Sequence, residues 1–235
     1  MATRYNGSAA ADTLDQRNAT GSVELYGLAG NDQLFGSAWG DVLVGGRGTD
    51  RLTGGGGSDV FAFAAGDSVV SVTYEKSKTA QFAFNITGQD VITDFALGQA
   101  GDRIAFAGTT LAANGAGDGV DSVRMWRDGD RIATHSIQNG VIEFADNNLA
   151  TRGNLVLISE AMVGAAVDYL AKNDLGAAGT TVVFNAKLTN YSLGVTTGHS
   201  YVYVQTGEGA GGNLVDLVGV QTQSVSSDVS GLILA

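Results

Sequence analysis

Large apolar residues recur every nine positions along residues 18–62, and from the second repeat on an aspartate stands two positions before each of them. Cut into nines, this stretch is NATGSVELY, GLAGNDQLF, GSAWGDVLV, GGRGTDRLT and GGGGSDVFA. The last two nonapeptides match the pattern GGxGxDxUx, in which U is a large apolar residue, at every defined position. Because the period holds without a slip, the segment is expected to fold as a stack of short repeated units.

Each nonapeptide has two halves of different character. The glycine-rich half must turn sharply, and glycine tolerates the positive φ of such turns at little cost. The other half is a very short strand whose single large residue points inward. One nonapeptide is therefore half a coil, and residues eighteen apart stack on the same side. This spacing places Asp32 over Asp50 and Asp41 over Asp59.

The stacked carboxylates predict metal sites, because two such charges repel unless a cation lies between them. Oxygen ligands on a flexible turn suit Ca²⁺ better than Mg²⁺, so several calcium ions are expected at Asp32, Asp41, Asp50 and Asp59. The alternative is that these aspartates form ordinary solvated turns. The remaining ligands would be backbone carbonyls of the turns, at Gly27, Ala29, Asn31, Gly36, Ala38, Gly40, Gly45, Arg47, Thr49, Gly54, Gly56 and Ser58.

The repeat weakens at both edges. Residues 7–15 (GSAAADTLD) form an offset partial repeat, which predicts an atypical N-terminal cap. Val23 stands where the first repeat would have an aspartate, so one side of the first coil should lack a carboxylate. Residues 63–71 (FAAGDSVVS) carry Ser68 in that place and are expected to form a fading last turn that could close a third site with Asp50.

The segments after the repeats predict further β-structure. Residues 72–89 are expected to form an inserted hairpin or loop, and DVITDFALGQAGDRIAF (90–106) two strands joined by a glycine-containing turn. Residues 107–120 are rich in glycine and alanine and predict a loop. Asp128-Gly129 and Asn139-Gly140 are hairpin signals.

One helix is expected in the last third of the chain. It spans residues 158–173, with Ser159 as the N-cap and Glu160 in the first turn. The later runs TTVVFNAKL, HSYVYVQTG and NLVDLVGV predict strands, and the chain ends in SSDVSGLILA, an acidic residue followed by an apolar tail.

Composition narrows the classes of protein. The net charge of −11 argues against nucleic acid and anionic membrane surfaces as partners. No cysteine is present, so an extracellular protein of this sequence would need a staple other than disulfides, and calcium could supply it. The N-terminus lacks the basic-then-apolar pattern of a signal peptide, and no run is as long as a transmembrane helix.

The sequence does not predict catalysis. HExxH and GxSxG are absent, there is no cysteine nucleophile, and His135 and His199 stand alone and far apart. A non-enzymatic function is therefore expected, with an unrecognised carboxylate-based enzyme in residues 107–235 as a weaker alternative. Exposed aromatic residues at Trp126, Tyr201 and Tyr203 would instead suit a carbohydrate-binding module.

The nonapeptides resemble those of the RTX calcium-binding exoproteins of Gram-negative bacteria, and residues 90–106 resemble the segment that follows the repeats in that family. The resemblance implies that Asp90 and Asp94 help to close the last calcium site. It also implies an all-β dominated fold, with a parallel β-roll followed by a β-rich C-terminal region with one helix. The expected divisions are 1–71 for the roll, 72–150 for a β-rich segment packed on it, and 151–235 for a C-terminal region carrying a type I secretion signal.

The family implies an extracellular or cell-surface protein exported by the type I secretion machinery, with self-assembly or cell-surface polysaccharide as further partners. A carbohydrate-binding RTX module attached to a polysaccharide-active exoenzyme is the alternative. Folding should depend on calcium, since one large residue per nine does not offset an ordering entropy on the order of 1 kcal/mol per residue. Calcium is expected to bind best around Asp41, Asp50 and Asp59, and the folded roll to start folding of the residues that follow.

Overall fold

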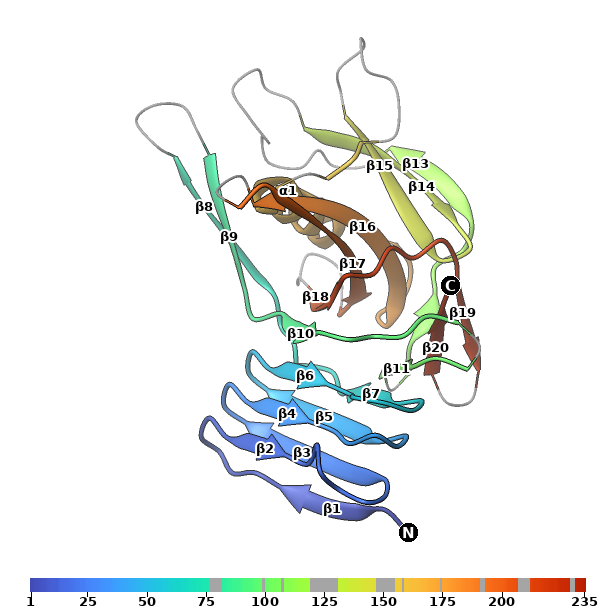
Figure 1. Ribbon diagram of the computed structural model, residues 1–235. Helices are drawn as coiled ribbons and strands as arrows, with labels where there is room; N and C mark the ends of the chain where they lie inside the picture. Colours follow the sequence, from blue (N-terminus) through green and yellow to red (C-terminus); the bar gives the residue numbers. More distant parts are fainter. Residues whose placement is uncertain are drawn as a thin grey trace.

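The computed structural model describes residues 1–76, 82–98, 100–106, 108–118, 131–146, 155–157, 159–173, 175–190, 193–206, 212–228 and 231–235. Strands dominate, and the described residues contain one helix. Figure 1 shows a stack of short strands that begins at the N-terminus and, above it, a set of longer strands around the helix. The predicted fold class is confirmed.

The stack of short strands is a parallel β-roll whose successive strands alternate between two sheets. One sheet receives β1 (Thr3–Asn6), β3 (Val23–Ala29), β5 (Val42–Arg47) and β7 (Val60–Phe63). The other receives β2 (Thr13–Asp15), β4 (Gln33–Phe35) and β6 (Arg51–Thr53). Leu25 pairs with Leu43 and Leu34 with Leu52, so the eighteen-residue coil predicted from the period is confirmed.

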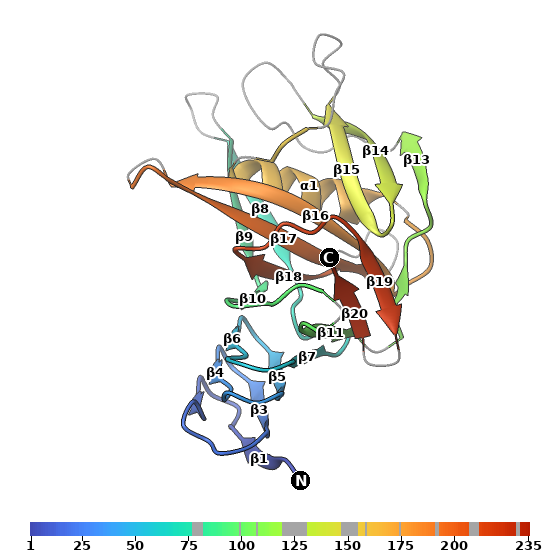
Figure 2. The same ribbon diagram turned by 45° about the vertical axis from the view of Figure 1, so that its right-hand side comes forward.

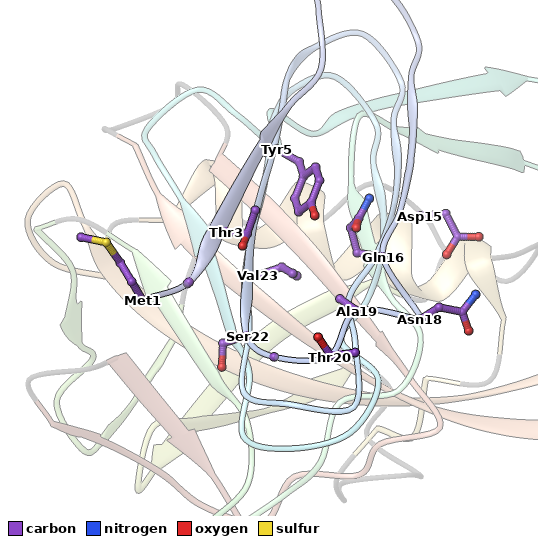
Figure 3. A pocket seen from close by; sticks show the side chains of 12 residues that line it. Met1, Thr3, Tyr5, Asp15, Gln16, Asn18, Ala19, Thr20, Ser22 and Val23 are labelled. Atoms are coloured by element: carbon purple, nitrogen blue, oxygen red, sulfur yellow. The ribbon is translucent and has the colours of Figure 1, made fainter.

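The N-terminal partial repeat forms a coil of its own. Thr3 pairs with Val23 and Thr13 with Gln33, so here the offset is twenty residues and the turns absorb two extra positions. A hollow of about 660 Å³ opens at this end of the roll, beside Tyr5 and Val23 (Figure 3). It lies beyond the first strands of both sheets, at the opposite end of the roll from the C-terminal strands.

The inward residue of every nonapeptide is buried. Leu25, Leu34, Leu43, Leu52 and Phe61 each have 0% exposure. They belong to one apolar cluster that continues into the C-terminal strands through Ile92, Ile104, Val215, Leu217 and Leu232. The core of the roll is thus closed at its C-terminal end by residues far away in the sequence.

The last coil of the roll is interrupted in sequence. β10 (Asp90–Ile92) pairs in parallel with β6, and β11 (Arg103–Phe106) pairs in parallel with β7. The predicted hairpin, β8 (Ser71–Lys76) and β9 (Phe82–Thr87), is inserted before them and projects from the stack (Figure 1). The predicted fading turn therefore needs correction: β10, and not the residues after Ser68, supplies the next strand over β6. β10 also ends at Ile92, earlier than the alternation through Phe95 suggests.

Both sheets of the roll continue into the C-terminal half, as Figure 2 shows from a second side. The seven-stranded sheet runs from β11 to β20 (Gly231–Leu234) and β19 (Val225–Asp228). The acidic-then-apolar end of the chain is thus part of a sheet. The eleven-stranded sheet runs from β10 through β18 (Gly212–Val218), β17 (Val195–Gln205), β16 (Thr180–Asn190), β15 (Val141–Asp146), β14 (Ile132–Gln138) and β13 (Gly115–Asp118), with β12 (Thr110–Leu111) beside β16.

The helix α1 (Glu160–Lys172) begins where the sequence predicts. The Ser159 hydroxyl oxygen accepts a hydrogen bond from the Met162 amide at 3.3 Å. Met162, Tyr169 and Leu170 are among its buried residues, and they join a second apolar cluster with residues of β14 to β18. The C-terminal half therefore has a core that does not include the roll. Among the described residues, no helix is both long and apolar enough to cross a membrane.

The hairpin and loop predictions have different outcomes. Asn139 (φ 50°) and Gly140 (φ 74°) form the predicted two-residue turn between β14 and β15. The predicted loop at 107–120 is wrong in part, because it contains β12 and the edge strand β13. The pairing of β13 with β14 uses backbone groups, which glycine and alanine supply without any hydrophobic alternation that sequence could reveal. Asp128-Gly129 lies outside the described residues.

Candidate metal centre

Two columns of aspartates run along the roll, one beside each sheet. In column 1, the amides of Asp12, Asp32 and Asp50 each donate to Oδ1 of the next aspartate, Asp32, Asp50 and Asp90, at 2.7 Å. Each carboxylate thereby holds the backbone of the coil before it. The structure brings Asp32 and Asp50 together as the spacing predicts, and it adds Asp90 to the same column.

Column 2 is built in the same way beside the other sheet. The Val23 amide donates to Asp41 Oδ1 at 2.7 Å, the Asp41 amide to Asp59 Oδ1 at 2.8 Å, and the Asp59 amide to Asp102 Oδ1 at 2.9 Å. Val23 supplies no carboxylate to this column, as expected. Asp102 was not among the predicted ligands, because an irregular spacer separates it from the repeats.

Each aspartate of a column, with the glycine-rich residues before it, forms one rung. The rungs differ in the partners of the second carboxylate oxygen, Oδ2. Oδ2 of Asp32 and Oδ2 of Asp50 are buried and have no hydrogen-bond partner among the described residues. Leaving a buried carboxylate oxygen unsatisfied is costly unless a cation or donor meets it. A metal ion at these two rungs would satisfy both oxygens.

The glycine of each turn leaves room for its own aspartate. A Cβ at Gly27 would lie 2.3 Å from Asp32 Oδ2 and 2.5 Å from the Gly45 carbonyl oxygen. A Cβ at Gly45 would lie 2.3 Å from Asp50 Oδ2. These positions therefore form oxygen-lined cradles that a side chain would fill, and the donor set of carboxylate and carbonyl oxygens suits Ca²⁺.

Serine closes two other rungs. In the turn before Asp41, the amide and hydroxyl of Ser37 donate to Asp41 Oδ2, the hydroxyl at 2.9 Å. In the turn before Asp12, Ser8 donates to Asp12 Oδ2 from its amide at 2.6 Å and from its hydroxyl at 2.8 Å. The hydrogen bonds therefore favour a metal at the rungs of Asp32 and Asp50 over the rung of Asp41, a different order from the one that the sequence suggests.

The remaining predicted ligands lie in the glycine-rich halves of the coils, where Gly27 and Ala29 belong to β3 and Gly45 and Arg47 to β5, and two of the predicted ligands already have hydrogen-bond partners. The Arg47 carbonyl accepts the Gly30 amide at 2.9 Å, and Asn31 Oδ1 accepts the Thr49 amide at 3.1 Å. The Gly54 carbonyl lies against Gly36 just as that of Gly45 lies against Gly27. Within the described part of the chain, no three side chains from histidine, cysteine, aspartate and glutamate converge on one point. Any ion in the roll would therefore depend on backbone carbonyls as well.

The two residues taken from the family resemblance lie in different settings. Asp90 stands in column 1 over Asp50, and its Oδ2 accepts a hydrogen bond from the Ser68 hydroxyl. Asp94 lies outside both columns. Its two oxygens accept the Gly54 amide at 2.9 Å and the Gly55 amide at 2.8 Å.

Burial raises the pKa of the column carboxyls. Together with the nearby carboxylates, it raises the pKa of Asp50 to about 6 and those of Asp59 and Asp90 to about 7, although hydrogen bonds to these carboxylates act in the opposite direction. The pKa values of Asp32 and Asp102 are raised for the same first reason, removal from water. Without a cation, the folded columns thus hold protons that the unfolded chain would release.

This protonation predicts opposite effects of pH on the calcium-free and calcium-bound roll. Carboxyls with a raised pKa stabilise the calcium-free fold fully below about pH 4, and the stabilisation is lost as the pH rises through about 7. In chelator, strand content measured by circular dichroism should therefore be higher at pH 5 than at pH 8. Since calcium must displace these protons, its apparent Kd should rise between pH 8 and pH 5. A Kd that does not change over this range would contradict the assignment.

The other candidate residues have structural roles. His135 Nδ1 lies 2.8 Å from the Tyr169 hydroxyl, and His199 Nδ1 lies 2.8 Å from Asp216 Oδ1. Tyr201 and Tyr203 are 4% and 0% exposed, so the expectation that they offer an exposed stacking surface is wrong. The alternation of β17 turns both rings toward the second apolar cluster. Trp126 lies outside the described residues.

A comparison with known protein families agrees with the repeat. A model of the RTX calcium-binding nonapeptide repeat matches residues 20–38 and 40–70, in four copies. Among solved structures, the chain is similar to the AlgE6R3 subunit from the Azotobacter vinelandii mannuronan C5-epimerase, with 32% identity over 56% of this chain and a TM-score of 0.33. The match covers 65% of that subunit, so this chain spans less than two thirds of it. No curated protein matches significantly.

Proposed function

We propose that calcium binding folds the roll of this RTX repeat protein. The folded molecule would then work outside the cell as a calcium-binding module without catalytic activity. The ions would lie at the rungs of the aspartate columns. Calcium would supply the staple that a chain without cysteine cannot obtain from disulfides.

One observation carries this proposal. Asp32 Oδ2 and Asp50 Oδ2 are buried, lie against Gly27 and Gly45, and have no hydrogen-bond partner within the ranges that the structure describes. Ordinary solvated turns would expose these oxygens or pair them with donors. Their burial next to the carbonyl oxygens of other coils supports a hard cation there, held by Asp32 and Asp50 and by carbonyls such as that of Gly45.

The energetics favour coupling between binding and folding. Each nine-residue half-coil buries one large side chain, while ordering costs on the order of 1 kcal/mol per residue. Extracellular calcium modules have a Kd of roughly 10⁻⁴–10⁻³ M, so calcium outside the cell would fold the roll and the far lower free calcium of a cytosol would not.

Circular dichroism of the full chain tests the coupling. Strand signal should increase when chelator is replaced by calcium at about ten times the upper end of that Kd range, and the increase should saturate. Magnesium is the control, because its smaller and stricter octahedral shell should not reproduce the effect at the same concentration. The same spectrum in chelator and in calcium would disprove the proposal.

Export and surface function are the finer part of the proposal. A type I channel needs an unfolded passenger, and a roll that is unfolded without calcium meets this requirement. We expect the C-terminal region, 151–235, to engage that machinery in a Gram-negative host, and the folded protein to contribute to a surface assembly. Light scattering should then show calcium-dependent association, whereas a monomer in saturating calcium would contradict assembly. The buried Tyr201 and Tyr203 rings argue against the glycan-binding alternative.

A further inference from the structure

In the last turn of the roll, an arginine side chain holds the backbone carbonyls. Residues 94–102 connect β10 to β11 and stack on the turn 54–59. The first residue after this turn is Arg103, whose side chain folds back over it. Its Nη1 donates to the carbonyl oxygens of Gly101 at 2.8 Å, Asp102 at 3.1 Å and Gly98 at 3.3 Å. A guanidinium group thus meets converging carbonyl oxygens, the kind of group that a calcium ion would otherwise bind.

The carboxylates of this turn are also fully engaged. Asp94 uses both oxygens on the Gly54 and Gly55 amides. Asp102 uses Oδ1 on the Asp59 amide and Oδ2 on the Ala96 amide, at 2.9 and 2.8 Å. Asp32 and Asp50 differ, because their Oδ2 atoms have no partner among the described residues. The donor set around 94–102 therefore does not fit a calcium ion, contrary to what the family resemblance implies for Asp94.

The turn is anchored on the C-terminal half at both ends. β10 pairs with β18, and β11 pairs with β20. The Gly98 amide donates to the Leu234 carbonyl at 2.8 Å. Ser58, from the turn below, donates its hydroxyl to the carbonyls of Ala100 and Gly101. The turn is thus fixed to a part of the chain that has its own apolar core, and it presents its lower side to the repeats.

We propose that Arg103 and Asp94 close the last turn of the roll without metal, and that this turn is the preformed end on which the calcium-dependent coils assemble. Arg103 takes the place of an ion by holding three carbonyls, and Asp94 takes the place of a ligand by holding two amides. The calcium dependence of the other coils rests on the proposed function, whereas the metal-free closure of the last turn does not.

Hydrogen exchange of the full-length wild-type chain tests the inference without any substitution. The amides of Ala96, Gly98 and Asp102 should be protected to the same degree in chelator and in calcium, whereas those of Asp32 and Asp50 should gain protection only in calcium. A calcium-induced gain at Ala96 and Asp102 as large as that at Asp32 would overturn the proposal and leave the proposed function intact. No calcium effect at Asp32 and Asp50 would refute the proposed function, and the protection of Ala96 and Asp102 in chelator would still decide the closure.

Variants test the two side chains. Arg103→Ala should raise the exchange rate of the Ala96 and Asp102 amides in chelator by about tenfold or more, because charge-assisted hydrogen bonds to three carbonyls are lost. Arg51→Ala, which removes an exposed guanidinium from β6, is the matched control and should leave those rates unchanged. Equal rates in Arg103→Ala and wild type would overturn the proposal.

Counting bound ions separates the two kinds of aspartate. Equilibrium dialysis should give one calcium ion fewer per chain for Asp50→Asn and the wild-type number for Asp94→Asn. An ion lost in Asp94→Asn would place a metal at the last turn and overturn the closure by Arg103.

Discussion

Replacing Asp50 with alanine is expected to abolish most of the calcium-induced folding of the roll. Asp50 stands in the middle of column 1, where its Oδ1 accepts the Asp32 amide and its amide donates to Asp90. Its buried Oδ2, like that of Asp32, has no hydrogen-bond partner in the described part of the chain. The substitution therefore removes a ligand and leaves the Asp32 amide without its acceptor.

The expected magnitude follows from linkage. A site occupied at 100 times its Kd stabilises the fold by about 2.7 kcal/mol, and an unsatisfied buried donor costs about 1–3 kcal/mol. Together these approach the whole stability of a weakly packed roll, so the calcium titration followed by circular dichroism should lose its transition or shift its midpoint by more than tenfold. Asp12→Ala is the matched control, since Asp12 lies in the same column at its solvent-exposed end and Ser8 already satisfies its Oδ2. If both variants shifted the midpoint equally, the ranking of the rungs would be wrong.

The repeats could be predicted because their contacts follow from a fixed spacing. Asp32 and Asp50 are 18 residues apart, which is the length of one coil. A period of nine therefore gives strand, inward residue and stacking partner at once, and Leu34 meets Leu52 as a direct consequence. Capping and turn preferences predicted Ser159 and Asn139-Gly140, because these residues act only on backbone a few positions away in the sequence.

The repeat spacing could not predict contacts across the inserted segments, and only the family resemblance pointed to Asp90. Asp90 lies 40 residues after Asp50, and Asp102 lies 43 residues after Asp59. The hairpin of β8 and β9 lies between the members of each pair in the sequence. Nothing in the spacing indicates that these distant residues continue the columns. The role of Arg103 depends on the backbone path of a single irregular turn. The burial of Tyr201 depends on which face of β17 meets the helix. These are properties of tertiary packing, which a periodic sequence pattern does not predict.

Gly45 provides a sharper test than any carboxylate ligand, since its substitution removes neither a charge nor a backbone carbonyl. A Cβ at Gly45 would lie 2.3 Å from Asp50 Oδ2, closer than atoms that are not bonded can approach. The carboxylate cannot swing away freely, because its Oδ1 is held by the Asp32 amide at 2.7 Å. Gly45→Ala should therefore displace the carboxylate from its cradle and lower the calcium affinity by tenfold or more.

Overpacking of this kind also costs about 1–3 kcal/mol of stability, which chemical denaturation in saturating calcium would measure. Gly21→Ala is the control, because a Cβ there meets no atom within 4 Å and the residue has no positive φ. Its effect should stay within about 0.5 kcal/mol, or be slightly stabilising through the loss of unfolded-state freedom. Wild-type calcium affinity in Gly45→Ala would mean that Asp50 Oδ2 does not bind the ion, whatever the fate of Asp50→Ala. The pair of glycine variants therefore separates a metal ligand at Asp50 from a carboxylate that only holds the backbone of the next coil.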